Sequence, residues 1–394
     1  MSVGIMKKIN IAIILPTDFT WNGEKNYFSS IISALDILPN KKVKINIFLG
    51  EQNQDFVKKL KIKHLNIIYS KIFKRNTFYN FLNKIFSIIF GYYNILLYLY
   101  FKSKKITHIS YFTPIVGFKN LVWFPDFQHI HLNKFFSKKD QTRRDKLYKN
   151  LIKYGDLHIV SSNDSKKDLI KFNNKSSNLL NTHVLNFIPN VNFENILNYQ
   201  DLKKKYKIKK RYIYIPNQFW LHKNHITLFK SIEILKKQNK IIQFILTGSK
   251  NDYRNLKYFK VLKSYLKNKN LEQNVKYLGE VPYNHVISLI HNCYLFINPS
   301  LFEGWSTTVE EAKIFKKKIL LSNINVHIEQ KDYNSVLFDK NDHIDLANKI
   351  SKIKGIQPKK LLQLKKNYQL KKKIFSKKIY EMFKNQNKSK YHCV

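Results

Sequence analysis

The stretch from Asn298 to Ala312 has the residue types and spacing best suited to chemistry, because two glutamates, Glu303 and Glu311, flank a group of serines and threonines. It follows an apolar run typical of a buried strand and leads into a helical pattern. The first N–H groups of a helix have no partner inside the helix and bind anions well. Gly304 allows a ligand to approach the backbone closely. The stretch therefore predicts a diphosphate-binding site between two carboxylates that can bind hydroxyl groups.

The start of this helix matches two capping boxes. Thr307 stands three residues before Glu310, and Thr308 stands three residues before Glu311. In a capping box, the hydroxyl and the carboxylate each bond to a backbone N–H of the first turn. The alternative interpretation of the stretch is a capped helix with solvated acids and no ligand.

A second polar stretch, Pro216–His225, follows the first predicted strand of the second half of the chain. A helical pattern begins directly after it, so Lys223 stands just before a helix start, where its charge and the helix dipole would both attract an anion. Because lysine is abundant in this chain, a solvated lysine is the alternative. Thr247 and Gly248 end another predicted strand and are candidates for a nucleotide pocket.

Further candidates lie in the first half of the chain. The segment Trp123–His131 follows a predicted strand and contains Asp126, His129 and His131, which could orient hydroxyl groups of a substrate. Ser161 ends another predicted strand and could contact a ligand. A lone histidine is more often structural than functional, so a structural role is the alternative for each histidine.

The elements that must position these residues are strands separated by helical stretches, which predicts parallel sheets. Six apolar runs lie in each half of the chain: Ile9–Leu15, Val43–Leu49, Leu65–Tyr69, Ile106–Phe112, Leu121–Phe124 and Leu157–Val160, then Tyr212–Ile215, Ile241–Leu246, Val275–Leu278, Tyr294–Ile297, Ile319–Leu321 and Val336–Phe338. Each half is expected to be a doubly wound sheet, with ligands beyond the carboxyl ends of its strands. We predict domains at residues 1–188 and 189–370 and a helical tail at 371–394.

The composition is strongly basic, with 71 Lys and Arg against 26 Asp and Glu. The surplus is scattered and lacks the arginine clusters and aromatic ladder of a nucleic-acid reader, so we predict no nucleic-acid partner. Solvated lysines explain the charge, and an anionic membrane surface remains compatible with it. Two cysteines, Cys293 and Cys393, give no disulfide framework, which indicates a reducing, cytoplasmic compartment. The apolar segment Ile85–Phe101 is interrupted by polar residues, which favours buried or membrane-touching helices over a span.

The stretches around Glu303 and Lys223 resemble the retaining glycosyltransferases of family four, and the resemblance runs through most of the chain. It implies the GT-B fold, in which two Rossmann-like, doubly wound α/β domains face a central cleft. It also implies that Glu303 contacts the donor sugar and Glu311 holds the ribose. The diphosphate region would be met by the loop and helix start around Gly304, Trp305, Ser306, Thr307 and Thr308.

The resemblance extends to a branch that reads Asn-Gln-Phe-Trp followed by His-Lys-Asn-His, as in Asn217–His225. It implies that Lys223 meets the diphosphate. Many relatives carry an arginine where this chain has Gln218. The loop expected at Trp21–Tyr27 is similar to the family's glycine-rich approach to phosphate, with Gly23 kept and Glu24 in place of a second glycine. An ordinary turn is the alternative.

The resemblance implies retaining transfer of a hexose or deoxyhexose from a nucleoside-diphosphate sugar to a growing surface glycan of the lipopolysaccharide, O-antigen or capsule type. Lys223 and Glu303, with Asp126 and His129, are expected to act in the transfer, and His129, His131 and Ser161 are expected to bind the acceptor. No metal and no cofactor are expected. The enzyme would be cytoplasmic and peripheral at the anionic inner leaflet. The alternatives are a nucleotide-sugar epimerase and a non-catalytic basic module that binds membrane or nucleic acid.

Overall fold

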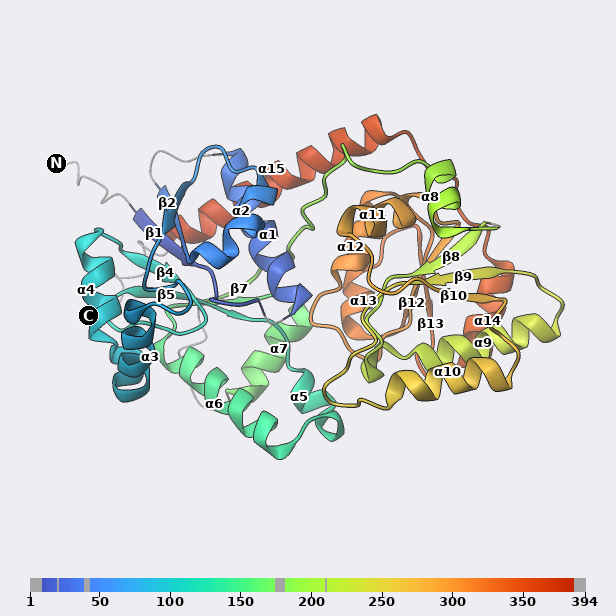
Figure 1. The fold of residues 1–394 in the computed structure, drawn as a ribbon, viewed down its shortest axis with the longest axis horizontal. Coiled ribbons are helices and arrows are strands. Elements are labelled where there is room, and N and C mark those ends of the chain that lie inside the picture. The colour runs from blue at the N-terminus through green and yellow to red at the C-terminus, as the bar shows by residue number, and fades with distance from the viewer. Residues whose placement is uncertain (1–8, 20, 39–42, 174–180, 210, 386–394) are drawn as a thin grey trace. The chain divides into compact units, whose positions relative to one another are not determined.

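The computed structural model describes residues 9–19, 21–38, 43–173, 181–209 and 211–385 (Figure 1). Its internal contacts divide the chain into two compact units. Of the described residues, the first unit contains those within 1–127, 142–190 and 370–394, and the second contains those within 128–141 and 191–369. Cys393 and the last nine residues of the predicted tail lie outside the described residues.

The first unit is built on a parallel sheet of seven strands in the order β3-β2-β1-β4-β5-β6-β7. The strands are β1 (Ile9–Ile14), β2 (Val43–Leu49), β3 (Asn66–Tyr69), β4 (His108–Ser110), β5 (Lys119–Phe124), β6 (Leu157–Val160) and β7 (Thr182–Val184). The central strands are apolar on both faces, as expected of a sheet covered by helices on both sides. Strand order reverses between β1 and β4.

The helices of this part of the chain connect the strands in sequence. They are α1 (Asn22–Ile37), α2 (Gln54–Leu60), α3 (Phe78–Phe90), α4 (Ile95–Ser103), α5 (Gln128–His131), α6 (Lys138–Tyr154) and α7 (Asn163–Phe172), with the 3₁₀ turns η1 (Glu51–Asn53), η2 (Gly91–Tyr93) and η3 (Asn133–Phe135). Helix α5 and η3 belong to the second unit by their contacts. Within the described residues, no single helix is long and apolar enough to cross a bilayer, and only the bent pair Phe78–Tyr93 and Ile95–Ser103, at 89°, reaches that length and composition.

The second unit is built on a parallel sheet of six strands in the order β10-β9-β8-β11-β12-β13. The strands are β8 (Tyr212–Ile215), β9 (Gln243–Leu246), β10 (Val275–Tyr277), β11 (Leu295–Asn298), β12 (Ile319–Ser322) and β13 (Ser335–Phe338). Their apolar side chains form a core with helices α9 (His225–Lys237), α10 (Tyr258–Asn268) and α14 (His343–Lys352). Strand order reverses between β8 and β11, which are neighbours in the sheet.

The helices of the second unit pack on the two faces of this sheet (Figure 1). They are α8 (Tyr199–Tyr206), α9 (His225–Lys237), α10 (Tyr258–Asn268), α11 (Tyr283–Asn292), α12 (Thr307–Ile314), α13 (Asn325–Gln330) and α14 (His343–Lys352), with the 3₁₀ turn η5 (Leu221–Lys223). The last helix, α15 (Leu361–Asn385), begins in the second unit, and its later turns belong to the first unit. There, the hydroxyl of Tyr380 donates to the carbonyl of Leu35 at 2.9 Å.

The prediction of two doubly wound parallel sheets is confirmed. The first sheet has one strand more than the sequence predicted, because β7 is an edge strand of three residues with too little apolar pattern to be recognised.

Candidate functional site

The candidate site lies at the carboxyl ends of β8 and β11. These neighbouring strands stand where strand order reverses, and doubly wound sheets bind their ligands at such a point. The loop after β8 carries Lys223 and the loop after β11 carries Glu303. Two residues that are 80 positions apart in the sequence are thus brought to the same edge of one sheet.

Lys223 and Glu303 form a buried ion pair. The ammonium Nζ donates to Oε1 of Glu303 at 2.6 Å, and the side chains are only 14% and 9% exposed. Burial by itself raises the pKa of Glu303, but the Lys223 charge and hydrogen bonds from Lys223 and Ser300 outweigh it, so the pKa lies below its ordinary value. Desolvation cancels much of the stability that such a pair could provide. A perturbed, buried pair at this edge therefore indicates a functional site.

A network of buried polar side chains holds the loop that carries Glu303. Oδ1 of Asn298, the last residue of β11, accepts from Nδ2 of Asn217 at 3.1 Å, and Nδ2 of Asn298 donates to Oγ of Ser306 at 2.9 Å. Oγ of Ser300 lies 2.7 Å from Glu303 Oε1 and 2.7 Å from Asn298 Oδ1, so its one hydrogen can go to either. Sequence reasoning did not single out Asn217, Asn298 or Ser300. Their signal was a polar residue at the carboxyl end of a buried strand, since Asn298 ends β11 and the other two stand two residues after β11 or β8.

Helix α12 begins differently from the prediction. Its N-cap is Ser306, whose own side chain makes no capping hydrogen bond. Thr307 and Thr308 are already helical, and the Glu310 carboxylate bonds to neighbouring side chains. Glu311 accepts a side-chain hydrogen bond. Both predicted capping boxes are therefore wrong, because each threonine lies one or two positions too far into the helix to act as its cap.

The last residue of α13, Gln330, takes over part of the capping. Its Oε1 accepts from the backbone N–H of Ser306 at 3.2 Å, and its Nε2 donates to the carbonyl of Ser306 at 3.0 Å. The Ser306 amide, which was predicted to face a diphosphate, is therefore bonded within the protein. Gly304 and Trp305 lie between β11 and α12 and are half-buried.

Glu311 lies in the second turn of α12 and is buried. Its Oε1 accepts from the Tyr283 hydroxyl at 2.8 Å, whereas its buried Oε2 has no hydrogen-bond partner among the described residues. Burial raises the pKa of Glu311 to about 8, and the Tyr283 hydrogen bond opposes the rise only in part. A buried polar atom without a protein partner requires an ordered water, an ion or a ligand to bond to, and this oxygen can bond to a ligand hydroxyl.

Gln218, Thr247 and Gly248 hold the loops after β8 and β9 together. The Gln218 side chain accepts from the backbone N–H of Ser249 at 2.5 Å, and Oγ1 of Thr247 lies 2.7 Å from the Tyr214 hydroxyl. Gly248 has φ +143°, and a Cβ there would collide with the backbone of Asn217 and Gln218. The side-chain oxygen of Gln218 and the hydroxyl of Thr247 are thus engaged within the protein, and Gly248 permits the close approach of the two loops.

Arg254 is a residue of this region that sequence reasoning missed. Its guanidinium donates to Asp252 Oδ1 at 2.9 Å and to Gln128 Oε1 at 2.9 Å. It stacks near the rings of Trp220 and Phe136, with centroids 5.3 and 5.2 Å from its Cζ. The residue places a fixed positive charge beside the loop that carries Lys223. No motif marks it, because its partners lie in three separate segments of the chain.

Gly23 lies in a helix and not in the loop that the sequence predicted. Helix α1 begins at Asn22, so most of the segment Trp21–Tyr27 is helical, and that prediction is wrong. A Cβ on Gly23 would overlap the Trp21 ring. That ring is parallel to the Trp123 ring at 6.1 Å, and Tyr27 stacks on Trp123 at 3.7 Å. A side chain at position 23 would therefore require the Trp21 ring to move from its place beside Trp123.

The predicted acceptor residues fall into two groups. Asp126 and Ser161 belong to the first unit, where Arg144 lies 3.5 Å from the Asp126 carboxylate and Trp123 Nε1 donates to Ser161 Oγ at 3.0 Å. His129 and His131 lie on α5, which belongs to the second unit. His129 is buried, whereas His131 is exposed and its ring lies 5.2 Å from the Phe302 ring. The structure thus brings His131 beside the loop that carries Glu303.

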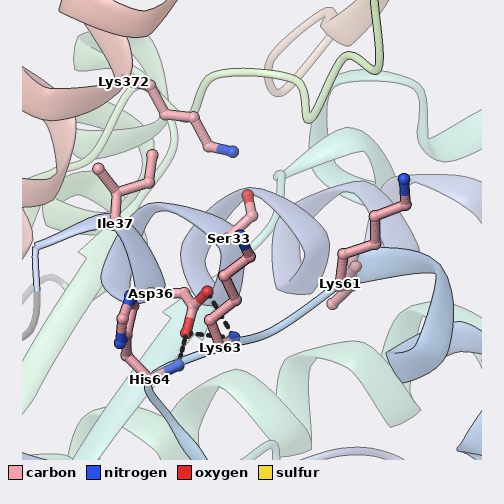
Figure 2. Close-up of a pocket in the computed structure, with 8 residues that line it drawn as sticks. Ser33, Asp36, Ile37, Lys61, Lys63, His64 and Lys372 are labelled. Atoms are coloured by element: carbon pink, nitrogen blue, oxygen red, sulfur yellow. Dashed lines mark hydrogen bonds between the residues drawn. The ribbon is translucent and has the colours of Figure 1, made fainter. Parts of the chain in front are cut away.

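A cavity of about 260 Å³ lies elsewhere, in the first unit (Figure 2). Its lining residues are Ser33, Asp36, Ile37, Leu60, Lys61, Lys63, His64 and Lys372. The Asp36 carboxylate accepts from three successive backbone N–H groups, at 2.9 Å from Lys63, 2.6 Å from His64 and 3.2 Å from Leu65. This carboxylate fastens the chain after α2 to α1, and no predicted site residue lines the cavity.

Within the described ranges, no group of three or more histidine, cysteine, aspartate or glutamate side chains is placed to hold a metal ion. The positive charge of the candidate site comes from Lys223 and Arg254.

Solved structures share the two-sheet architecture. A glycosyltransferase from Rickettsia africae matches with a TM-score of 0.63 and 17% identity, over 97% of this chain and 99% of that one. Anabaena HepE, solved with UDP and glucose, matches with a TM-score of 0.63 and 12% identity, over 97% of this chain and 99% of that one. Sucrose-phosphate synthase from Thermosynechococcus elongatus matches with a TM-score of 0.61 and 14% identity, over 96% of this chain and 94% of that one. At these identities the likeness shows the fold, which is the GT-B fold of glycosyltransferases.

The second unit also matches a family by sequence. Residues 198–371 match the family described as Glycosyl transferases group 1, and this range contains β8 to β13 with both Lys223 and Glu303. No curated protein matches the chain. Residues 198–371 are therefore similar to the glycosyl transferases group 1 family, and the candidate site lies within the matched range.

Proposed function

We propose that this protein is a retaining glycosyltransferase that moves a hexose or deoxyhexose from a nucleoside-diphosphate sugar to a growing surface glycan on a lipid carrier. The observation that carries the proposal is the buried Lys223–Glu303 pair at the reversal of strand order in the range that matches the glycosyl transferases group 1 family. The Anabaena neighbour was solved with UDP and glucose and also with UDP-glucose, which supports a uridine nucleotide sugar as the first donor to test.

In the proposed reaction, the oxygen of an acceptor hydroxyl bonds to the anomeric carbon of the donor sugar while the bond from that carbon to the diphosphate oxygen breaks. The departing diphosphate oxygen takes the hydroxyl proton on the same face of the sugar, so the configuration is retained. Lys223 and the N–H groups at the start of α12 stabilise the charge that develops on the diphosphate. The proposal includes no metal and no cofactor, because these groups supply the positive charge.

The remaining residues have binding roles in the proposal. Glu303 holds the Lys223 ammonium in place and contacts the donor sugar. Oε2 of Glu311 accepts from a ribose hydroxyl, which satisfies an otherwise unbonded buried atom. His129 and His131, with Asp126 and Ser161, orient the acceptor. The enzyme works in the cytoplasm, where nucleotide sugars are the donors.

A thermal-shift panel of nucleoside diphosphates and their sugars tests the donor. We expect one nucleotide to raise the unfolding midpoint, since a ligand at a hundred times its Kd stabilises by about 2.7 kcal/mol. Lys223→Ala and Glu303→Gln should abolish this shift. The exposed controls Lys230→Ala and Glu272→Gln should keep it. If no nucleotide shifts the midpoint, or if the controls lose the shift as well, the proposal is wrong.

The type of reaction is tested with the donor that the panel identifies. The anomeric configuration of the product, measured by NMR, should equal that of the donor sugar. A product of inverted configuration contradicts the retaining mechanism. Isomerisation of the donor without any acceptor would instead identify a nucleotide-sugar epimerase.

A further inference from the structure

Helix α3 exposes its apolar side chains. Phe78 is 69% exposed, Ile88 83% and Ile89 66%. Further large apolar residues of α3, η2 and the start of α4 are also exposed: Tyr79, Phe81, Phe90, Tyr93, Ile95 and Leu99. We call these nine residues the α3 surface. Scattered exposed apolar residues are normal, but so many in one short segment indicate an interaction site.

Polar contacts hold α3 in place, which is the reverse of the usual packing of a surface helix. Its only buried residue among those described is Asn80, whose Nδ2 donates to the carbonyl of Ile72 at 2.8 Å. Asn94, also buried, donates to Asn83 Oδ1 at 2.9 Å and to Ser87 Oγ at 2.8 Å. The asparagines thus face inward, whereas the residues of the α3 surface face outward and Leu82, Ile85 and Phe86 are half-buried.

Helix α4 anchors this arrangement to the body of the first unit. Leu97 and Phe101 of α4 pack in a core with Ile14, Phe48 and Phe73. The α3–η2 segment and α4 lie next to each other in Figure 1 and are bent by 89°, so they form a folded surface and not a continuous span. The exposed residues therefore sit on a fixed support.

The charged residues in the part of the sequence that carries the α3 surface are all basic. No aspartate or glutamate occurs from residue 56 to residue 125. Lys74 and Arg75 pair with Glu51 and Asp18 from outside that range. Five other lysines near the α3 surface are exposed: Lys71, Lys84, Lys102, Lys104 and Lys105. An apolar surface with a basic border complements an anionic bilayer, which accepts apolar side chains at its boundary and attracts lysines to its head groups.

We propose that the α3 surface docks the protein on an anionic bilayer, with α3 lying in the plane of the interface. Phe78, Ile88 and Ile89 enter the boundary between head groups and acyl chains, and the lysines contact anionic head groups. In the proposed function, this surface gives the enzyme access to a lipid-borne acceptor. Its test measures binding and not transfer, so either proposal can fail without the other.

Co-sedimentation with vesicles tests the surface. We expect the full chain to bind vesicles of phosphatidylcholine and phosphatidylglycerol more tightly than vesicles of phosphatidylcholine alone, and added salt to reduce the difference. Replacing Ile88 and Ile89 together by Ser should weaken binding at least about tenfold, because two side chains lose their burial in the interface. Lys102→Gln with Lys104→Gln should reduce the preference for anionic vesicles.

The matched control replaces two exposed isoleucines of the second unit, Ile241 and Ile344, which are 76% and 54% exposed. The control should bind vesicles like the unchanged protein, and both double variants should keep its unfolding midpoint. Equal vesicle binding by the Ile88/Ile89 variant and the control overturns the proposal. A second outcome also overturns the proposal: the protein is a dimer, and the Ile88/Ile89 variant is a monomer that still binds vesicles. In that case a second copy of the chain covers the α3 surface.

Discussion

Replacing Lys223 by Met removes the ammonium, keeps most of the aliphatic chain, and leaves the Glu303 carboxylate buried without its ionic partner. The carboxylate can escape this state by taking up a proton. With an ordinary pKa of 4.5, protonation at pH 7 costs about 3 kcal/mol, at 1.36 kcal/mol per unit. This is close to the cost of about 3–5 kcal/mol for breaking a buried pair. We therefore expect Lys223→Met to lower the free energy of unfolding by about 3 kcal/mol at pH 7.

The loss should depend on pH with a definite sign. In the unchanged protein the pKa of Glu303 is depressed, so its contribution to stability is present above pH 4.5 and is lost as the pH falls through the folded pKa. In Lys223→Met, burial without the ammonium raises that pKa, so stability is instead lost as the pH rises above 4.5. The difference between the two proteins should therefore widen from pH 5 to pH 7. Urea unfolding at several pH values measures it.

The double variant Lys223→Met with Glu303→Gln separates stability from activity. It removes both charges, so most of the lost stability should return. Sugar transfer should stay about 10²–10³ times slower than in the unchanged protein, because the cation that stabilises the leaving diphosphate is still absent. Full transfer activity in the double variant would refute the functional part of this reasoning. An unchanged unfolding curve for Lys223→Met would refute the structural part.

Three further predictions concern residues around the pair. Because burial raises the pKa of Glu311 to about 8, the stability that its protonated form provides is complete below pH 4.5 and is lost as the pH rises towards 8. Glu311→Gln should remove this pH dependence of the free energy of unfolding, which urea unfolding measures. An unchanged pH dependence would contradict the raised pKa of Glu311. Arg254→Lys keeps the charge but loses the planar guanidinium, so urea unfolding should show a free energy of unfolding lower by about 1–3 kcal/mol. An unchanged free energy would mean that the contacts to Asp252 and Gln128 are dispensable. Gly248→Ala adds a Cβ where φ is +143° and where it would clash with the Asn217 backbone. The thermal unfolding midpoint of this variant should therefore fall by several degrees. An unchanged midpoint would show that the loop can shift.

Much of the fold could be predicted from the sequence because parallel strands buried on both faces need long apolar runs, such as Ile9–Leu15 and Tyr212–Ile215. Short edge strands lack this requirement, which explains why β7 was missed. The convergence of Lys223 and Glu303 could be anticipated for a related reason. Both follow strands of one parallel sheet, and the carboxyl ends of such strands meet at one edge.

The details of the site depended on tertiary contacts that no local pattern encodes. The spacing of Thr307 and Glu310 matched a capping box, but Gln330 bonds to both backbone groups of Ser306 and the helix starts one residue earlier than a Thr307 cap requires. The asparagines of the α3 region were visible only as interruptions of an apolar segment. Their inward hydrogen bonds, and the outward apolar side chains that result, required the structure.

The two glutamates of the site illustrate how one loop and one helix can give the same side chain different properties. Glu303 is held below its ordinary pKa by Lys223, whereas burial near Tyr283 raises the pKa of Glu311 to about 8. At neutral pH, one carboxyl group is therefore ionised and the other is mostly protonated. The ionised group can keep an ammonium in place for a diphosphate, and the protonated group can be buried without a cation. A ribose hydroxyl that donates to Glu311 would favour its ionised form, so donor binding below pH 8 should release a proton, which calorimetry in buffers of different ionisation enthalpy can detect.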